Sequence, residues 1–297
     1  MTTEQGAVYD LGYEPYHGER RGRRGATLTI WADGNRRVLG IRRKARRKIM
    51  PWLLIAMAVL PAAVFVGIAF VLPADIANEF ELTGENSNLF QLGGTIAMIF
   101  TALAAPELLI PDRRDGVLSM LSSRPLTSND YLAARFAANV TVVGGFLLVP
   151  QILIFIGQAG TDPDGLIQGL INAAPTIPKI LAVTAIYIFA FVPLGFMIAS
   201  LVKRKSIAAS VFLAVIIGLT AFAEAIVRNS VIPGGRWVAL LAPINTANAA
   251  NNWIFGSIDH DSLLGAADIH PLMGIVALVV IGSGGVLISM RRYRGLM

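Results

Sequence analysis

Residues 107–135 read ELLIPDRRDGVLSMLSSRPLTSNDYLAAR, a charged stretch between two long apolar runs. Pro111 predicts the end of the preceding helix, because proline has no amide hydrogen and disfavours helix in the residue before it. Asp112 is then expected to cap a new helix, with Asp115 three residues later in a box-like position. The Arg-Pro pair at residues 124–125 ends that helix, and residues 127–130 offer caps for the next one. We therefore expect a short helix over residues 112–123.

This short helix is predicted to be amphipathic. Val117, Leu118 and Leu121 share an apolar face, whereas Arg113 and Arg114 are polar. A short amphipathic helix held between two membrane spans can transmit force from a cytosolic partner. We expect its apolar face to be buried in that partner rather than in lipid.

The composition places the chain among multi-pass membrane proteins. Of its 297 residues, 55% are hydrophobic and only 15% are charged, and six separate stretches are long and apolar. The sequence contains no cysteine, which excludes disulfides and zinc–thiolate sites, and its three histidines leave little for a metal site. The formal charge of +6 does not indicate nucleic-acid binding, because the basic residues flank apolar spans instead of forming a patch.

The predicted fold is all-α, with six transmembrane helices. The expected spans are residues 51–73, 89–110, a third ending near residue 157, 180–202, 206–227 and 271–290. Residues 1–50 form a basic cytosolic arm with an amphipathic helix, and residues 51–297 form the transmembrane domain. Residues 160–177 are expected to be a loop. Residues 228–270 are too interrupted by proline and asparagine to span, so we expect short re-entrant helices dipping into the outer leaflet.

The distribution of positive charge predicts the orientation. Of the 25 Lys and Arg residues, 22 lie in the N-terminal arm, in residues 107–135, in the turn at residues 203–205 and at the C-terminus. The alternate segments hold the other three. Cytosolic loops carry an excess of Lys and Arg, so both termini are predicted to lie in the cytosol.

The arm before the first span contains a second amphipathic pattern. Val38, Ile41, Ala45 and Ile49 recur at helical spacing from residue 33 onward, among eight Arg and Lys residues. Such a helix lies on an anionic membrane surface. The alternative is that these charges only fix the topology, and Gly40 weakens the helical pattern.

Few polar groups lie inside the predicted spans. Glu224 is the only acid well inside an apolar run, which makes it a candidate functional residue. It also lies about 27 Å along its helix from Ser206, near the outer interface. The alternative for Glu224 is therefore a structural or solvated role. Ser283 stands among glycines that we attribute to close helix packing. No phosphate-binding loop motif is present.

Three features together resemble the membrane subunits of bacterial ABC-2-type transporters. The family's coupling segment has an E-x-x-x-G-T-L-E core and a later Lys; here residues 112–119 read DRRDGVLS and Arg135 is the later basic residue. The six-span layout with a basic helix before the first span is similar. Residues 240–248, LLAPINTAN, are similar to the family's L-S-P-F-like segment.

The resemblance implies the permease subunit of an ATP-driven exporter in the bacterial cell membrane. ATP and magnesium would bind to a separate ATP-binding cassette subunit, with no cofactor on this chain. A second permease subunit, identical or different, and membrane lipid would be the other partners. The residues implied in ATPase coupling are Glu107, Asp112, Arg113, Arg114, Asp115, Gly116, Val117, Leu118, Leu121 and Arg124. The alternatives are a membrane scaffold or assembly subunit and a membrane-embedded enzyme.

Overall fold

The computed structural model describes residues 22–41, 44–45, 48–71, 86–122, 126–229, 233–256 and 261–295. Within these ranges the chain is helical and contains no strand. Six long helices are α2 (Ile49–Val71), α4 (Asn86–Arg114), α6 (Ser128–Gly160), α8 (Thr176–Leu201), α9 (Lys205–Asn229) and α12 (Pro271–Arg294). Each is long and apolar enough to cross a membrane, which confirms the predicted multi-pass, all-α class.

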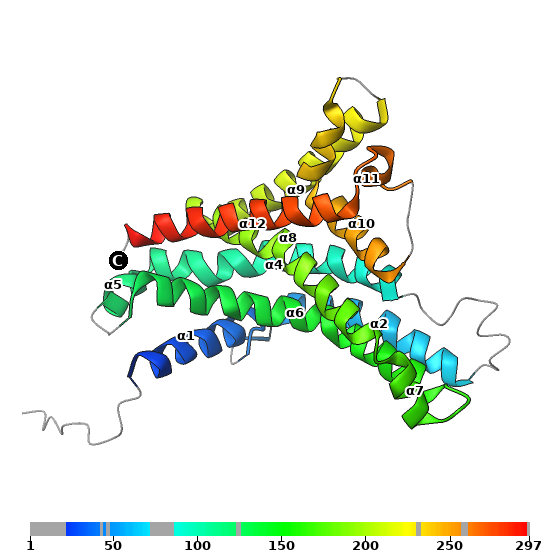
Figure 1. Cartoon of the computed structure of the whole chain (residues 1–297). Coiled ribbons are helices and arrows are strands. Elements are labelled where there is room, and N and C mark those ends of the chain that lie inside the picture. Colours follow the sequence, from blue (N-terminus) through cyan, green and yellow to red (C-terminus); the bar gives the residue numbers. More distant parts are fainter. Residues whose placement is uncertain are drawn as a thin grey trace, which may run out of the picture.

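Helix α4 lies in the middle of the bundle, where α2, α6, α8 and α9 pack against it (Figure 1). In the apolar 18-residue stretch of α4, 78% of the residues are buried. The corresponding share is 17% in α2 and 22% in α9, which lie on the outside. On α12, a Cβ added at Gly282 would lie 3.1 Å from the carbonyl oxygen of Phe189, and one at Gly285 would lie 3.0 Å from that of Pro193. Both carbonyls belong to α8, so the glycines around Ser283 allow close helix packing, as predicted.

The helix before the charged stretch does not end at Pro111. Helix α4 continues through Pro106 and Pro111 to Arg114, so the predicted boundary is wrong. The ladder resumes past the proline, where the amide of Asp115 donates to the carbonyl of Pro111 at 2.8 Å. Gly116, with φ of +71°, follows, and the separate short helix α5 covers only Val117–Ser122. Asp112 therefore lies inside α4 and caps no helix.

The predicted helix over residues 33–49 is also wrong. The helix in this region is α1 (Gly22–Val38), which begins well before residue 33 and ends before the rest of the stripe. It ends in a Schellman motif: the amide of Ile41 donates to the carbonyl of Arg36 at 2.8 Å, and the amide of Gly40 to that of Arg37 at 3.3 Å. Gly40 has φ of +67°, a conformation that glycine adopts without steric cost. The left-handed turn at Gly40 divides the apolar stripe.

Shorter helices lie at the end of the bundle opposite α5. Helix α7 (Leu166–Ala173) replaces the loop expected over residues 160–177. The predicted short helices of residues 228–270 are η2 (Gly235–Leu241), α10 (Pro243–Phe255) and α11 (Leu263–Ala266). Asn251 and Asn252 of α10 are buried and bonded to Ser87 of α4, with Asn251 Nδ2 2.9 Å from the Ser87 carbonyl oxygen. The re-entrant placement of these helices in a membrane stays a prediction.

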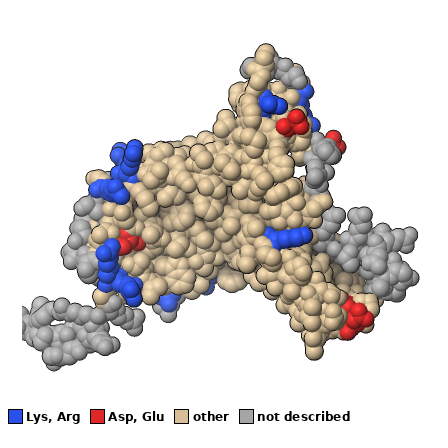
Figure 2. All heavy atoms as spheres, in the orientation of Figure 1, with Lys and Arg blue, Asp and Glu red and all other residues tan. Residues whose placement is uncertain are grey.

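The two ends of the bundle differ in charge. Helix α5, the C-terminal end of α4 and the C-terminal end of α12 share one end (Figure 1). Lys and Arg side chains gather there in the space-filling view (Figure 2). The last turn of α4 contains Arg113 and Arg114, and the last turn of α12 contains three arginines. We call this the basic end.

Candidate functional site

A buried carboxylate organises the basic end. Asp112 is 1% exposed and accepts hydrogen bonds from three side chains on two other helices. Arg37 of α1 donates from Nη1 to Oδ1 at 2.6 Å. Arg135 of α6 donates to Oδ2 from Nη2 at 2.7 Å and from Nε at 3.1 Å, and the Tyr131 hydroxyl donates to the same oxygen at 2.8 Å. This one carboxylate joins α1, α4 and α6.

A second carboxylate completes the charge balance. Asp33 Oδ2 of α1 accepts from Arg37 Nη2 at 3.0 Å and from Arg135 Nη1 at 2.9 Å. Two carboxylates thus face two guanidinium groups. We refer to Asp33, Arg37, Asp112, Tyr131 and Arg135 as the Asp112 cluster. Because every buried charge in it has an opposite partner, the cluster is compatible with burial among apolar helices.

Close packing seats α1 against α6 beside this cluster. A Cβ added at Gly34 would lie only 2.7 Å from the Ala138 Cβ and 3.3 Å from the Arg135 guanidinium. Any larger residue would push α1 away from Arg135. Gly34 therefore lets the helix backbone approach closely enough for Asp33 to pair with Arg135.

The aromatic rings extend the connection to α12. Tyr131 and Tyr293 are both fully buried, and their rings stack with centroids 5.8 Å apart. The Tyr293 hydroxyl lies 3.4 Å from the carbonyl oxygen of Leu109 on α4. The Arg135 guanidinium lies 5.7 Å from the centroid of the Tyr131 ring. Four helices therefore meet at the cluster.

Two further side chains tie α4 to α8 and α9. Arg113 donates to the carbonyl oxygens of Ala199, Ser200 and Val202, where a cation stabilises the C-terminal end of α8. Lys205, the first residue of α9, lies with its Nζ 2.5 Å from Glu107 Oε2. The last two turns of α4 thus bond to α1, α6, α8, α9 and α12.

Helix α5 is anchored in the chain's own core by one leucine. Leu118 is 5% exposed and belongs to the main apolar cluster, whereas Met120 is 72% exposed. Leu121 is half-buried against the same cluster, and Val117 is also half-buried. The expectation that Leu118 faces a partner is wrong, because its side chain is already covered. Met120 is the apolar side chain that α5 presents outward.

The start of α6 carries the predicted caps. The Thr127 hydroxyl accepts from the amide of Asp130 at 3.2 Å, and the Thr127 amide donates to Asp130 Oδ2 at 2.9 Å, which makes a capping box. Asp130 also pairs with Arg23 of α1 at 2.8 Å. This hydrogen bond and the negative charge of Asp130 raise the pKa of Arg23 above its ordinary value. One carboxylate thus caps α6 and holds the start of α1.

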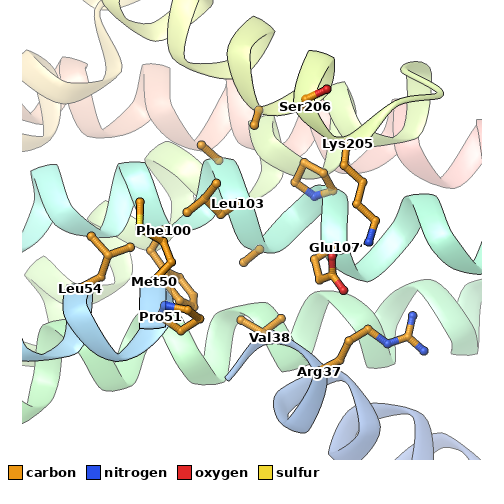
Figure 3. A pocket seen from close by; sticks show the side chains of 14 residues that line it. Arg37, Val38, Met50, Pro51, Leu54, Phe100, Leu103, Glu107, Lys205 and Ser206 are labelled. Atoms are coloured by element: carbon orange, nitrogen blue, oxygen red, sulfur yellow. Dashed lines mark hydrogen bonds and ion pairs between the residues drawn. The ribbon is translucent and has the colours of Figure 1, made fainter. Parts of the chain in front are cut away.

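A pocket of about 430 Å³ opens beside the Asp112 cluster, between α2, α4 and α9. Figure 3 shows the polar side chains of Arg37, Glu107 and Lys205 on one side of it, and Leu54 and Phe100 on the other. Glu107 and Phe100 are seven residues apart on α4, so polar and apolar walls are separated by about 10 Å along the helix.

The structure brings some predicted site residues together and separates others. Glu107, Asp112 and Arg113 lie in one helix and bind four neighbouring helices, as described above. Arg114 and Asp115 form an exposed pair at 2.8 Å. Arg124 lies outside the described residues. Val38 is buried, whereas Ile41, Ala45 and Ile49 are exposed and no longer share a helix face with it.

Glu224 lies at the opposite end of the bundle. Its Oε2 pairs with Arg228 Nε at 2.5 Å, and its Oε1 accepts from Asn245 Nδ2 at 2.9 Å. The carboxylate therefore links α9 to α10, which fits the structural role left open above. Its functional role stays a prediction.

The sequence pattern did not identify Asp33, Arg37 or Lys205 as site residues. Asp33 and Arg37 are four residues apart on α1, a spacing that favours a helical ion pair. That signal could have placed both on one face. Their pairing with Asp112 and Arg135, which are 75 and 102 residues away from Arg37 and Asp33 respectively, could not be read from local spacing.

No protein-family model matches this sequence, and no curated protein matches it either. Among the described residues there is no group of three His, Cys, Asp or Glu side chains placed to hold a metal ion. The function must therefore be argued from the arrangement of the helices and their charges.

Proposed function

We propose that this chain is the membrane-spanning permease subunit of an ATP-driven exporter, moved by a separate ATP-binding subunit that contacts α5. The observation that carries the proposal is the contrast within α5: Leu118 is anchored in the core, and Met120 is 72% exposed at the basic end. A partner that binds Met120 would push on an element fixed to the bundle, so the push would reach the core.

The Asp112 cluster supplies the path for that force. Helices α4 and α6 flank α5 in the chain, and Asp112 and Arg135 join them with a hydrogen bond of 2.7 Å. Arg37 adds α1 to the same carboxylate. A displacement of α5 would move α4, α6 and α1 as a unit relative to the outer helices α2 and α9, which bury much less of their surface. The positive charge at this end supports a cytosolic location for α5.

The partial likeness of residues 107–135 to the ABC-2 coupling segment supports the same assignment. In this proposal Asp112, Arg113 and Glu107 hold α4 against its neighbouring helices, and Met120 contacts the ATP-binding subunit. ATP and magnesium belong to the partner subunit. A second permease subunit completes the assembly in the bacterial cell membrane.

The test is to extract the tagged chain from its native membrane in mild detergent, purify it, and measure the ATPase activity that co-purifies with it. Burying a methionine side chain contributes about 1.5–3 kcal/mol, so Met120→Asp should weaken the complex about tenfold or more. Met120→Leu keeps an apolar side chain and is the matched control. The proposal fails if no ATPase co-purifies, or if Met120→Asp retains the wild-type amount of activity. Leu118→Asp is unsuitable here, because it would disrupt the core of the chain itself.

A further inference from the structure

The pocket between α2, α4 and α9 changes from polar to apolar along its length. Its polar wall is formed by Glu107, Lys205 and Arg37, which lie toward the basic end. Its apolar wall is formed by Leu54, Phe100 and other side chains further along α4 (Figure 3). The helices on either side, α2 and α9, are the least buried of the six long helices. The pocket therefore lies on the surface that would face the membrane.

The polar wall presents an exposed lysine. Lys205 pairs with Glu107, but its ammonium group has three hydrogens and its side chain is 40% exposed. Arg37 lines the same wall with its side chain 16% exposed. Lys48 is exposed and directly precedes α2, two residues before Met50 of the pocket. Arg37 is neutralised by Asp112 and Asp33, so the exposed positive charge comes from Lys205 on the polar wall and from Lys48 just before α2.

We propose that this pocket binds a phospholipid with an anionic headgroup, from the leaflet at the basic end. The phosphate would lie near Lys205 and Lys48, and one acyl chain would lie along Leu54, Phe100 and Leu103. The order of polar and apolar walls matches the order of headgroup and acyl chain in that leaflet. A volume of about 430 Å³ suits part of a lipid, so the second chain would remain in the bilayer.

The alternatives fit the pocket less well. A free polar molecule would place polar groups or water against the apolar wall. This is unfavourable, because apolar surface is stabilised by burial against apolar groups. A neutral lipid would make no use of the exposed ammonium groups of Lys205 and Lys48. The proposal does not depend on the exporter assignment, since a scaffold with the same helices would bind the same lipid.

Filling the pocket provides the first test. Ala209 of α9 lines the pocket and is half-buried, so Ala209→Phe would place a ring where the acyl chain is proposed to lie. Ala221→Phe is the matched control, because Ala221 is exposed on the same helix and does not line the pocket. Leu103→Trp, at a position 41% exposed on the opposite wall, is a second filling variant.

The readout is native mass spectrometry of the full chain titrated with phosphatidylglycerol. We expect one tightly retained lipid in the wild type and in Ala221→Phe, and loss of that lipid, about tenfold or more in affinity, in Ala209→Phe and Leu103→Trp. Equal retention by all four proteins would overturn the proposed site.

The charge of the headgroup is tested separately. Lys205→Gln should weaken phosphatidylglycerol binding about fivefold, the effect of one surface charge on anionic lipid, whereas Lys203→Gln, at an exposed position outside the pocket, should not. Phosphatidylcholine should bind more weakly than phosphatidylglycerol. Equal binding of the two lipids would overturn the anionic preference, and displacement by millimolar inorganic phosphate would assign the site to a free anion instead.

Discussion

Removing the charge of Asp112 should strongly destabilise the protein. Asp112→Asn preserves the size of the side chain but leaves one acceptor oxygen where Arg37, Tyr131 and Arg135 now donate four hydrogen bonds. Arg135 would remain 3% exposed with a single carboxylate partner, Asp33, whose own side chain is 51% exposed. A buried guanidinium would thus lose its enclosed counter-charge.

The expected loss of unfolding free energy follows from the burial of Arg135. Breaking a buried ion pair by removing one partner costs about 3–5 kcal/mol, and the remaining pair with Asp33 favours the lower value. About 3 kcal/mol corresponds to a fall in Tm of roughly 6 °C or more. Thermal unfolding of the purified chain in detergent, monitored by circular dichroism, measures this fall in Tm.

An exposed ion pair provides the control for this experiment. Arg114 and Asp115 pair at 2.8 Å with side chains 70% and 52% exposed, so Arg114→Gln should cost less than about 1 kcal/mol. Adding Arg135→Gln to Asp112→Asn should cost less than the sum of the two single changes, because both remove the same interaction. A loss below about 1 kcal/mol for Asp112→Asn would refute the view that the cluster holds the helices together.

Three further outcomes are expected. A tag at Gly165 should be accessible from outside intact cells and a tag at Thr127 should not; labelling of Thr127 from outside would contradict the orientation drawn from the charge distribution. Gly34→Val should destabilise the chain by about 1–3 kcal/mol in thermal unfolding, because its Cβ would lie 2.7 Å from that of Ala138, and an unchanged Tm would show that α1 is not seated there. Asp268→Gly should raise stability by up to about 1 kcal/mol, since Asp268 has φ of +53°, and a loss of stability would show that its side chain compensates for the strain.

The six long helices could be predicted from the sequence because the length of an apolar run is enough to identify a span. Boundaries were harder to predict. Pro111 was expected to end α4, yet the helix continues to Arg114, where Arg37 and Arg135 neutralise Asp112. A local rule for proline does not include partners on other helices, so it placed the boundary too early.

The same reason explains the failure at Leu118, whereas the helix predicted over residues 33–49 failed because of the local backbone at Gly40. An apolar face on a six-residue helix does not reveal whether it is covered by the same chain or by a partner, and Leu118 is covered by its own core. Gly40 interrupts the apolar stripe in the sequence, and in the structure its left-handed conformation ends α1. The capping box at Thr127 was predictable, because all of its atoms lie within four residues.

The distance in sequence between the members of the Asp112 cluster sets an order of events during synthesis. Arg135 is made 102 residues after Asp33, which takes about 5–20 s at ordinary rates of translation. Until then α1 has no complete docking site, and Asp112 lacks the guanidinium of α6. The N-terminal helix must therefore wait undocked while α2 and α4 enter the membrane, and it can take its final place only after α6 has followed. Docking of α1 is thus completed by the third long helix and not by the first.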